Sequence, residues 1–182
     1  KIKFYGASVF TLKEAYEIIK FPNIKSIQMV FNIFRQKPSD EFFRIANKKN
    51  ISIIARGSLA SGLLTGTIDE KSKFTNTDHR NFNKEGKRFN IGDTFSGLDV
   101  KKTQKALFEL KKILPNDHSL IDVALGWILS HKEVTVVIPG ATHPSQVIMN
   151  TKTSKHHKIK NLIPKINIIY EKYIKPEIHD RW

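Results

Sequence analysis

Residues 134–150 read VTVVIPGATHPSQVIMN, and this stretch contains the structural unit that recurs through the chain. The run VTVVI (Val134–Ile138) is short, apolar and rich in β-branched residues, which is typical of a buried strand. Pro144 suits the first turn of a helix, because the amide that proline lacks would have no partner there. The stretch therefore predicts a strand followed by a short helix through about Thr151.

The same order of strand and helix recurs toward the N-terminus, and further helices are predicted before and after residues 134–150. Short apolar runs predict strands at residues 2–9, 24–31 and 51–55. Apolar stripes at helical spacing predict helices at residues 12–20, from Ser39 or Asp40 to Asn50, and at 101–114, 120–131 and 158–173, the last ended by Pro176. Capping boxes mark two helix starts, one formed by Thr11 and Glu14 and one by Ser119 and Asp122.

Strands that alternate with helices predict an α/β fold with a parallel sheet. Four strands are convincing, and each is apolar enough to require cover on both faces. Half of a (β/α)8 barrel fits this pattern better than a dinucleotide-binding sheet, because no GxGxxG turn follows any strand. We expect a single domain over residues 1–182, of the TIM-barrel type, in which this chain supplies about four βα units.

The segment from Arg56 to Val100 shows little periodicity. Loops of this length are uncommon inside a compact domain, and they are usually functional or disordered. In a barrel the residues that follow the strands form the active face. We therefore predict that residues 56–100 form a long cofactor or substrate loop region.

Charge is the unusual feature of the composition. The chain has 31 Lys and Arg against 17 Asp and Glu, a net charge of +14. Such a charge attracts polyanions, including nucleic acid, nucleotides and anionic lipid. Most of the excess is lysine spread along polar helix faces, however, so solvation alone is a competing explanation. A basic nucleic-acid-binding module, suggested by the run Lys152–Lys160, is accordingly one alternative function.

Cysteine is absent, which excludes disulfides, thiolate metal sites and a cysteine nucleophile. This absence favours a reducing compartment and hence a cytoplasmic location. No apolar run approaches the roughly 18 residues that cross a bilayer, so we expect no membrane-spanning helix. The chain starts at Lys1 rather than Met, from which we expect a fragment or a processed product.

Six short strings carry a resemblance to a known family. They are YGASV (5–9), SIQMVFN (26–32), ARGSLASGLLTG (55–66), DHRNFN (78–83), VIPGATHPSQVIMN (137–150) and IHDRW (178–182). Four of them stand at the ends of four successive strands, and in this order they resemble the aldo-keto reductases. DHRNFN and IHDRW resemble one bacterial oxidoreductase branch of that family. The resemblance covers almost the whole chain but only the C-terminal half of the family's barrel, strands five to eight.

The resemblance implies NADP(H) as cofactor and assigns residues to it. Ser8 and Gln28 would bind the nicotinamide carboxamide. Arg56 would stack on the nicotinamide or pair with the pyrophosphate. The remaining cofactor residues would wrap the pyrophosphate (Gly57, Ser58, Leu59, Ala60 and Ser61), close over the 2′-phosphate (Arg80), or form the adenosine pocket (Gly140, Thr142, Gln146 and Asn150).

The residues themselves give partial reasons for the last group. Gly140 lets a ligand approach the backbone, Thr142 offers a hydroxyl, and the helix start near Pro144 offers free amides for a phosphate. Gln146 and Asn150 lie four residues apart and so share one helical face. An ordinary loop with a proline start and a solvated loop arginine at position 80 are the competing interpretations.

Three positions depart from the family pattern. Val9 replaces the usual Asn, Met149 stands where an acidic residue often holds the adenine, and Thr67 stands where some members place a pyrophosphate lysine.

The family's Asp-Tyr-Lys-His catalytic tetrad lies on early strands, and this chain offers no candidate region for it. We therefore expect no catalytic residues here and no hydride transfer by these 182 residues alone. The parent activity would be reduction of an aldehyde or ketone, with the N-terminal half of the same barrel as partner. A non-catalytic, nucleotide-binding half barrel is a further alternative.

Other residues invite simpler interpretations. His143, His156 and His157 lack the spacing of a metal site, and we expect none. Trp127, Met149 and the pair Phe42–Phe43 are predicted to pack in the core. A half barrel would also leave two sheet edges and one apolar face open to a partner, to dimerisation or to aggregation.

Overall fold

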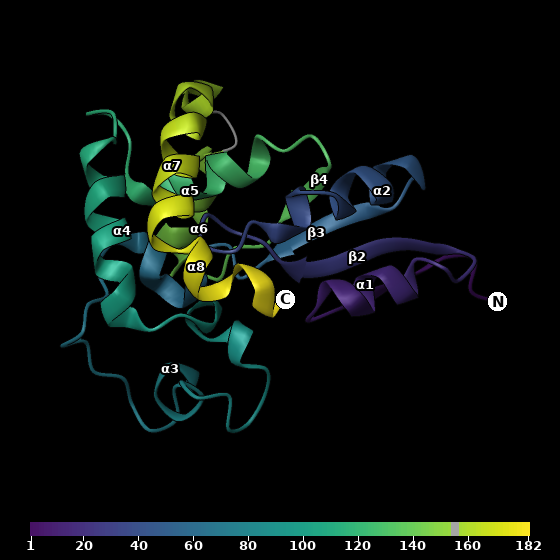
Figure 1. Ribbon diagram of the computed structural model, residues 1–182, viewed down its shortest axis with the longest axis horizontal. Coiled ribbons are helices and arrows are strands. Elements are labelled where there is room, and N and C mark those ends of the chain that lie inside the picture. Colours follow the sequence, from purple (N-terminus) through teal and green to yellow (C-terminus); the bar gives the residue numbers. More distant parts are fainter. Residues whose placement is uncertain (154–156) are drawn as a thin grey trace.

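The computed structural model describes residues 1–153 and 157–182, which form a helix-covered parallel sheet (Figure 1). Its four strands are β1 (Tyr5–Ser8), β2 (Ile24–Val30), β3 (Ser52–Arg56) and β4 (Val134–Val137). The strands pair in chain order, and all three pairings are parallel. All four predicted strands are therefore present, and their carboxyl ends meet at one edge of the sheet.

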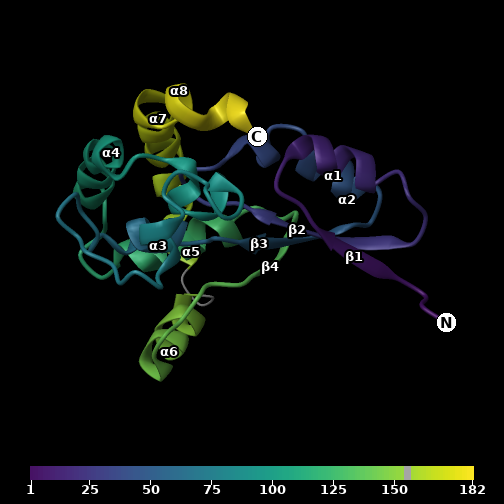
Figure 2. The same cartoon turned by 90° about the horizontal axis from the view of Figure 1, so that it is seen from below.

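The helices are α1 (Leu12–Ile18), α2 (Phe42–Lys48), α3 (His79–Phe82), α4 (Val100–Lys112), α5 (Leu120–Leu129), α6 (Pro144–Lys152), α7 (Ile163–Tyr173) and α8 (Lys175–Ile178). Figure 2 shows α1, α2, α7 and α8 on one side of the strands, whereas α6 projects on the other. No residue of α6 is buried. The helices thus cover the sheet unequally.

The two central strands alternate as a half-covered sheet requires. Ile27 and Met29 on β2 and Ile53 and Ala55 on β3 are buried. Gln28, between the first two, is only partly buried. The expectation that every strand is covered on both faces is wrong: three of the four residues of β1 are exposed. Within the described part of the chain, one edge of β1 and one edge of β4 have no neighbouring strand.

The largest buried side chains form an aromatic group under the sheet. Trp127 on α5 packs against Phe31, with ring centroids 4.9 Å apart, and Phe31 also contacts Phe43 at 4.7 Å. Phe42 is likewise fully buried. Trp127 and the Phe42–Phe43 pair are therefore core residues as predicted, but Met149 is 46% exposed and is not. Its helix, α6, packs too loosely on the rest of the chain to bury it.

Local signals placed most helix starts correctly. Thr11 and Glu14 form a capping box at α1, and Ser119 and Asp122 form one at α5. The helix start expected at Ser39 or Asp40 is wrong. A 3₁₀ turn occupies Lys37–Ser39, where Pro38 lies in its first turn, and α2 begins only at Phe42.

The predicted helix 158–173 is divided in the same way. Residues 157–162 form a 3₁₀ turn, and α7 begins at Ile163, because Pro164 lacks the amide that an interior helical position needs. Pro176 lies in the first turn of α8, so it starts a new short helix after α7 has ended at Tyr173.

The long segment 56–100 is a folded loop built from short turns. Three 3₁₀ turns (Ala60–Thr65, Ile91–Asp93 and Phe95–Gly97) and α3 make up much of it. The buried side chain of Asn83 connects separate parts of this loop. Its NH2 group donates to Thr94 Oγ1 at 3.1 Å, and its Oδ1 accepts from the backbone amides of Arg88 and Phe89. No apolar periodicity is needed for this arrangement, which explains why the sequence showed none.

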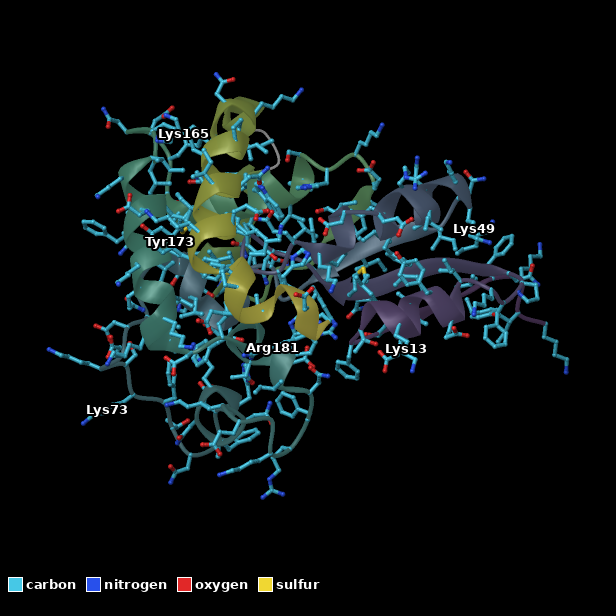
Figure 3. The ribbon with its side chains drawn as sticks, viewed as in Figure 1. Lys13, Lys49, Lys73, Lys165, Tyr173 and Arg181 are labelled. Carbon is cyan, nitrogen blue, oxygen red and sulfur yellow. The ribbon has the colours of Figure 1, made fainter. Side chains whose placement is uncertain are left out.

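Positive charge is spread over the outline of the molecule. Figure 3 shows Lys13, Lys49, Lys73 and Lys165 at widely separated points, on α1, after α2, in the long loop and on α7. This distribution agrees with lysines on solvated faces. The basic run Lys152–Lys160 includes residues 154–156, which lie outside the described part of the chain.

Candidate cofactor site at the carboxyl ends of the strands

A pocket of about 900 Å³ lies beyond the carboxyl ends of β3 and β4. Most of its wall comes from three separate parts of the chain, namely the turn after β3, the loop around α3, and the β4–α6 connection with α6 itself, and Asp93 and Ile121 also line it. Ten of the thirteen predicted cofactor residues line it, namely Arg56, Gly57, Ser58, Leu59, Ser61, Arg80, Gly140, Thr142, Gln146 and Asn150. Parallel strands bring their ends together, and this is why residues so distant in sequence meet here.

Arg56, the last residue of β3, is held by protein groups on both terminal nitrogens. Its Nη1 pairs with the Asp93 carboxylate, and its Nη2 donates to the carbonyl of Val9 at 3.2 Å. The guanidinium also lies 5.2 Å from the centre of the Phe10 ring. Its Nε is buried, and no described residue forms a hydrogen bond with it. The edge of this guanidinium is therefore largely occupied.

The turn after β3 adopts the backbone that a close ligand approach favours. Gly57, Ala60, Ser61 and Gly62 all have φ between 49° and 99°, the left-handed region. Among the described residues, the amides of Ser58 and Leu59 make no hydrogen bond. Ala60 does not line the pocket, and its amide is already used, because it donates to Gly57 O at 2.9 Å.

The serine hydroxyls of this turn are engaged with protein. Ser61 Oγ donates to the carbonyl of Asp93 at 3.1 Å and accepts from the amide of Phe95 at 3.0 Å. Ser58 Oγ donates to Ala55 O at 3.4 Å. These hydroxyls thus brace the turn, and the free backbone amides are the groups it offers to an anion.

Arg80 reaches the pocket from α3 and is oriented by its own N-cap residue. Asp78 accepts from Arg80 Nε and from Nη2, the latter at 2.6 Å. The guanidinium stacks 4.3 Å from the Phe74 ring centre. These hydrogen bonds from Arg80 lower the pKa of Asp78 to about 2, so the carboxylate is charged at neutral pH. Nη1 makes no hydrogen bond to any residue that the structure describes, and a Cβ built on Gly62 would lie 3.6 Å from it.

The β4–α6 connection forms the open side of the pocket. A Cβ built on Gly140 would meet nothing within 4 Å. Gln146 Oε1 accepts from the Thr142 amide at 2.7 Å and from the Thr142 hydroxyl at 3.3 Å. The side-chain NH2 of Gln146 makes no hydrogen bond within the described residues and is free for a ligand. Met149 and Thr67, two of the positions that depart from the family pattern, also line the pocket.

Ser8 and Gln28 lie apart from this group. They are register partners at the end of β1 and near the end of β2. Neither lines the pocket, although Ser8 is exposed and Gln28 partly so. The third departure, Val9, is 5% exposed and packs in the core. The structure therefore gathers ten predicted residues and leaves Ser8, Gln28 and Ala60 outside their pocket.

Sequence reasoning missed the two aspartates that orient the arginines. Asp93 lies 37 residues after Arg56, inside a loop without periodicity, and no signal linked the two. Asp78 was detectable, since it stands at the N-cap of α3 two residues before Arg80.

Two other properties concern the described residues. No three histidine, aspartate or glutamate side chains gather there as a metal site would require, and His156 lies outside them. None of the helices in that part of the chain combines the length and the apolar character that crossing a bilayer requires.

Comparisons with known proteins agree with the fold. A model described as the Aldo/keto reductase family matches residues 1–171. The chain is 28% identical over 159 residues to the uncharacterized oxidoreductase YqkF of Bacillus subtilis (strain 168), which covers 87% of this chain and 46% of that protein. It is 26% identical over 149 residues to the aldo-keto reductase YhdN of the same organism, covering 81% and 42%.

A solved structure extends the comparison to three dimensions. The holo form of aldo-keto reductase AKR11C1 from Bacillus halodurans is 25% identical, superposes with a TM-score of 0.63, and is matched over 98% of this chain and 52% of its own. The chain thus spans about half the length of the relatives it matches. The sequence resemblance is confirmed over most of the chain, and the protein belongs to the aldo/keto reductase family.

Proposed function

We propose that this chain is the cofactor-binding half of an NADP(H)-dependent oxidoreductase that reduces aldehydes or ketones. One observation carries the proposal: ten residues assigned to the cofactor by resemblance line a single pocket, although they come from three distant parts of the chain. The chain would correspond to strands five to eight of the family's barrel, and a cytoplasmic location goes with this role.

The pocket suits a dinucleotide in size and in chemistry. Its 900 Å³ is at the upper end of the range of small-molecule sites. Free amides at Ser58 and Leu59 would face the pyrophosphate, and the open backbone at Gly140 would admit the adenosine. The spare Nη1 of Arg80 gives the 2′-phosphate a charged donor, which favours NADP(H) over NAD(H).

The contacts of Arg56 bear on its role. Asp93 and the carbonyl of Val9 occupy both terminal nitrogens, and the Phe10 ring lies 5.2 Å from the guanidinium, so its other face is the one left for contact with a ring. This supports stacking on the nicotinamide over pairing with the pyrophosphate. When bound, the cofactor would supply the hydride; the chain's own residues would orient it.

The proton needed for carbonyl reduction would come from outside these residues. Among the described residues, the pocket wall includes neither tyrosine nor lysine. Tyr170, one of four tyrosines, is buried and bonded to His179 Nδ1 at 2.7 Å, away from this pocket. We therefore assign no catalytic residue to this chain.

We propose an N-terminal half of the same barrel as the partner of the two open sheet edges. Tyr5 on β1 is 41% exposed, Val136 on β4 is 41% exposed, and Ile138 just after β4 is 43% exposed. Strand pairing at both edges would close the barrel and cover these side chains. The nucleic-acid alternative gains no support, since the lysines are dispersed; the non-catalytic alternative differs only in whether an N-terminal half exists.

Cofactor binding tests the proposal directly. Titration of the chain, alone and joined to its N-terminal half, with NADPH and NADH is monitored by nicotinamide fluorescence. NADPH should bind more tightly, and Arg56→Ala and Gln146→Ala should each weaken it. Unchanged affinity in both variants would refute the site.

A further inference from the structure

Trp182 packs over a buried arginine, Arg35, that does not line the proposed cofactor pocket. The guanidinium of Arg35 lies 3.8 Å from the centre of the Trp182 ring, and Arg35 is 4% exposed. Its Nη2 donates to the carbonyl of Phe10 at 2.6 Å. The pKa of Arg35 is lowered to about 9, mainly by burial and secondly by the positive charge of Arg56, while the negative charge of Asp93 raises it. Arg35 therefore stays charged at neutral pH and lies within the field of the Arg56–Asp93 pair.

The same tryptophan packs on the loop that contains Asp93. A Cβ on Gly92 would lie 2.8 Å from Trp182 Cη2 and would also collide with Arg35 Nη1. A Cβ on Gly97 would lie 2.9 Å from Trp182 Cζ2. Arg181, labelled in Figure 3, adds a hydrogen bond from Nη1 to Gly97 O at 3.3 Å. Residues 92–97 thus have the C-terminal segment against them at both ends.

Asp93 lies between these two glycines in the sequence and contacts two residues of the pocket wall, Arg56 and Ser61. Asp93 pairs with Arg56 through its carboxylate and with Ser61 through its carbonyl. Phe10 links the two arginines, because its carbonyl accepts from Arg35 and its ring faces Arg56. Any shift of residues 92–97 would therefore move the Asp93 carboxylate away from Arg56.

We propose that Arg181 and Trp182 form a strap that presses residues 92–97 onto Arg35, and that Trp182 and Arg35 are thereby positioning residues for Arg56. This inference rests on the proposed function in one respect, which is that NADP(H) is the ligand that contacts Arg56. Neither Trp182 nor Arg35 lines the cofactor pocket. Their effect on binding passes through Asp93 and disappears when Arg56 is absent.

A double-mutant cycle tests this dependence. Trp182→Ala should weaken NADPH binding about three- to tenfold, the range expected for losing one cation–π contact that orients a ligand group. In an Arg56→Ala background the same substitution should change affinity by less than about twofold. Trp182→Phe, which keeps a ring over Arg35, should restore most of the binding. Phe108→Ala, which removes an aromatic that is 59% exposed on α4, is the matched control.

The outcomes separate the strap from general stability and from the proposed function. Equal weakening by Trp182→Ala with and without Arg56, or no weakening at all, would overturn the strap. If the unmodified protein binds no NADPH, the proposed function fails and amide hydrogen exchange decides about the strap. Faster exchange at residues 93–98 in Trp182→Ala, but not in Phe108→Ala, would support it; equal exchange in both would overturn it.

Discussion

Arg80 and Asp78, two residues apart in the sequence, form a bidentate ion pair in which Nε lies 3.0 Å from Oδ1 and Nη2 lies 2.6 Å from Oδ2. The pair fixes the plane of the guanidinium and leaves Nη1 as the donor without a partner among the described residues. An arginine already oriented by a carboxylate loses little side-chain freedom on meeting a phosphate. The aspartate thus orients the arginine, although the ion pair as a whole carries no net charge.

Removal of Arg80 should therefore change cofactor preference more than overall binding. Arg80→Ala should weaken NADPH binding about tenfold or more and leave NADH binding within about twofold, because only NADPH carries the 2′-phosphate. Lys84→Ala removes the same charge from an exposed position outside the pocket and should change neither. Equal losses for the two cofactors, measured by fluorescence titration, would contradict the assignment of Arg80 to the 2′-phosphate.

Two glycines of the pocket should respond differently to alanine. Gly140 lies outside the left-handed region, and its Cβ would enter open space, so Gly140→Ala should leave the free energy of unfolding unchanged or raise it by about 0.5 kcal/mol. The added methyl should nevertheless weaken NADPH binding. Gly57 has a φ of 61°, and Gly57→Ala should lower the free energy of unfolding by about 1–2 kcal/mol.

Urea unfolding and NADPH titration of both variants check this pair. If Gly140→Ala destabilises the fold as much as Gly57→Ala, the β4–α6 connection is not the open wall described above.

The sequence predicted those features that depend on neighbouring residues. Strands, capping boxes and the helix start at Pro144 each rest on a few consecutive side chains, and all were found. The division before Ile163 was missed because the apolar stripe continues across Pro164, whose missing amide decides the boundary. Ten of the residues assigned by resemblance line one pocket, because the ends of parallel strands meet at one edge of the sheet.

The rest of the site depends on distant contacts that no local pattern encodes. The pairing of Arg56 with Asp93 and the stacking of Trp182 on Arg35 join segments 37 and 147 residues apart. Sequence periodicity reports which side chains share a face of one element, and it carries no information about such pairs.

His131 should make stability depend on pH. It packs among Phe31, Phe43 and Trp127, and its Nδ1 lies 2.9 Å from the carbonyl of Trp127. Burial lowers the pKa of His131 below its usual 6.5, although the hydrogen bond to Trp127 opposes this. The unfolded chain therefore binds the proton first as pH falls, so the free energy of unfolding should decrease below about pH 6.5.

Urea unfolding between pH 5 and 8 measures this dependence. His131→Phe keeps a ring in the aromatic group and should remove the histidine's part of the decrease. His143→Gln, at an exposed position, should leave the decrease in place. A pH profile that His131→Phe does not alter would show that another group titrates.

Open sheet edges should make residues 1–182 self-associate when produced without a partner half. Phe4, beside β1, is 59% exposed, and Val136 on β4 is 41% exposed. Lysine at an edge discourages strand pairing, because its charge would have to be buried. Phe4→Lys together with Val136→Lys should therefore shift the chain toward monomer in sedimentation velocity over a range of concentrations. Phe108→Lys adds one lysine on the exposed face of α4, away from the sheet edges, and should leave association unchanged. A chain that is monomeric without any substitution, or one that Phe108→Lys dissociates equally well, would show that the edges are not the surface on which it associates.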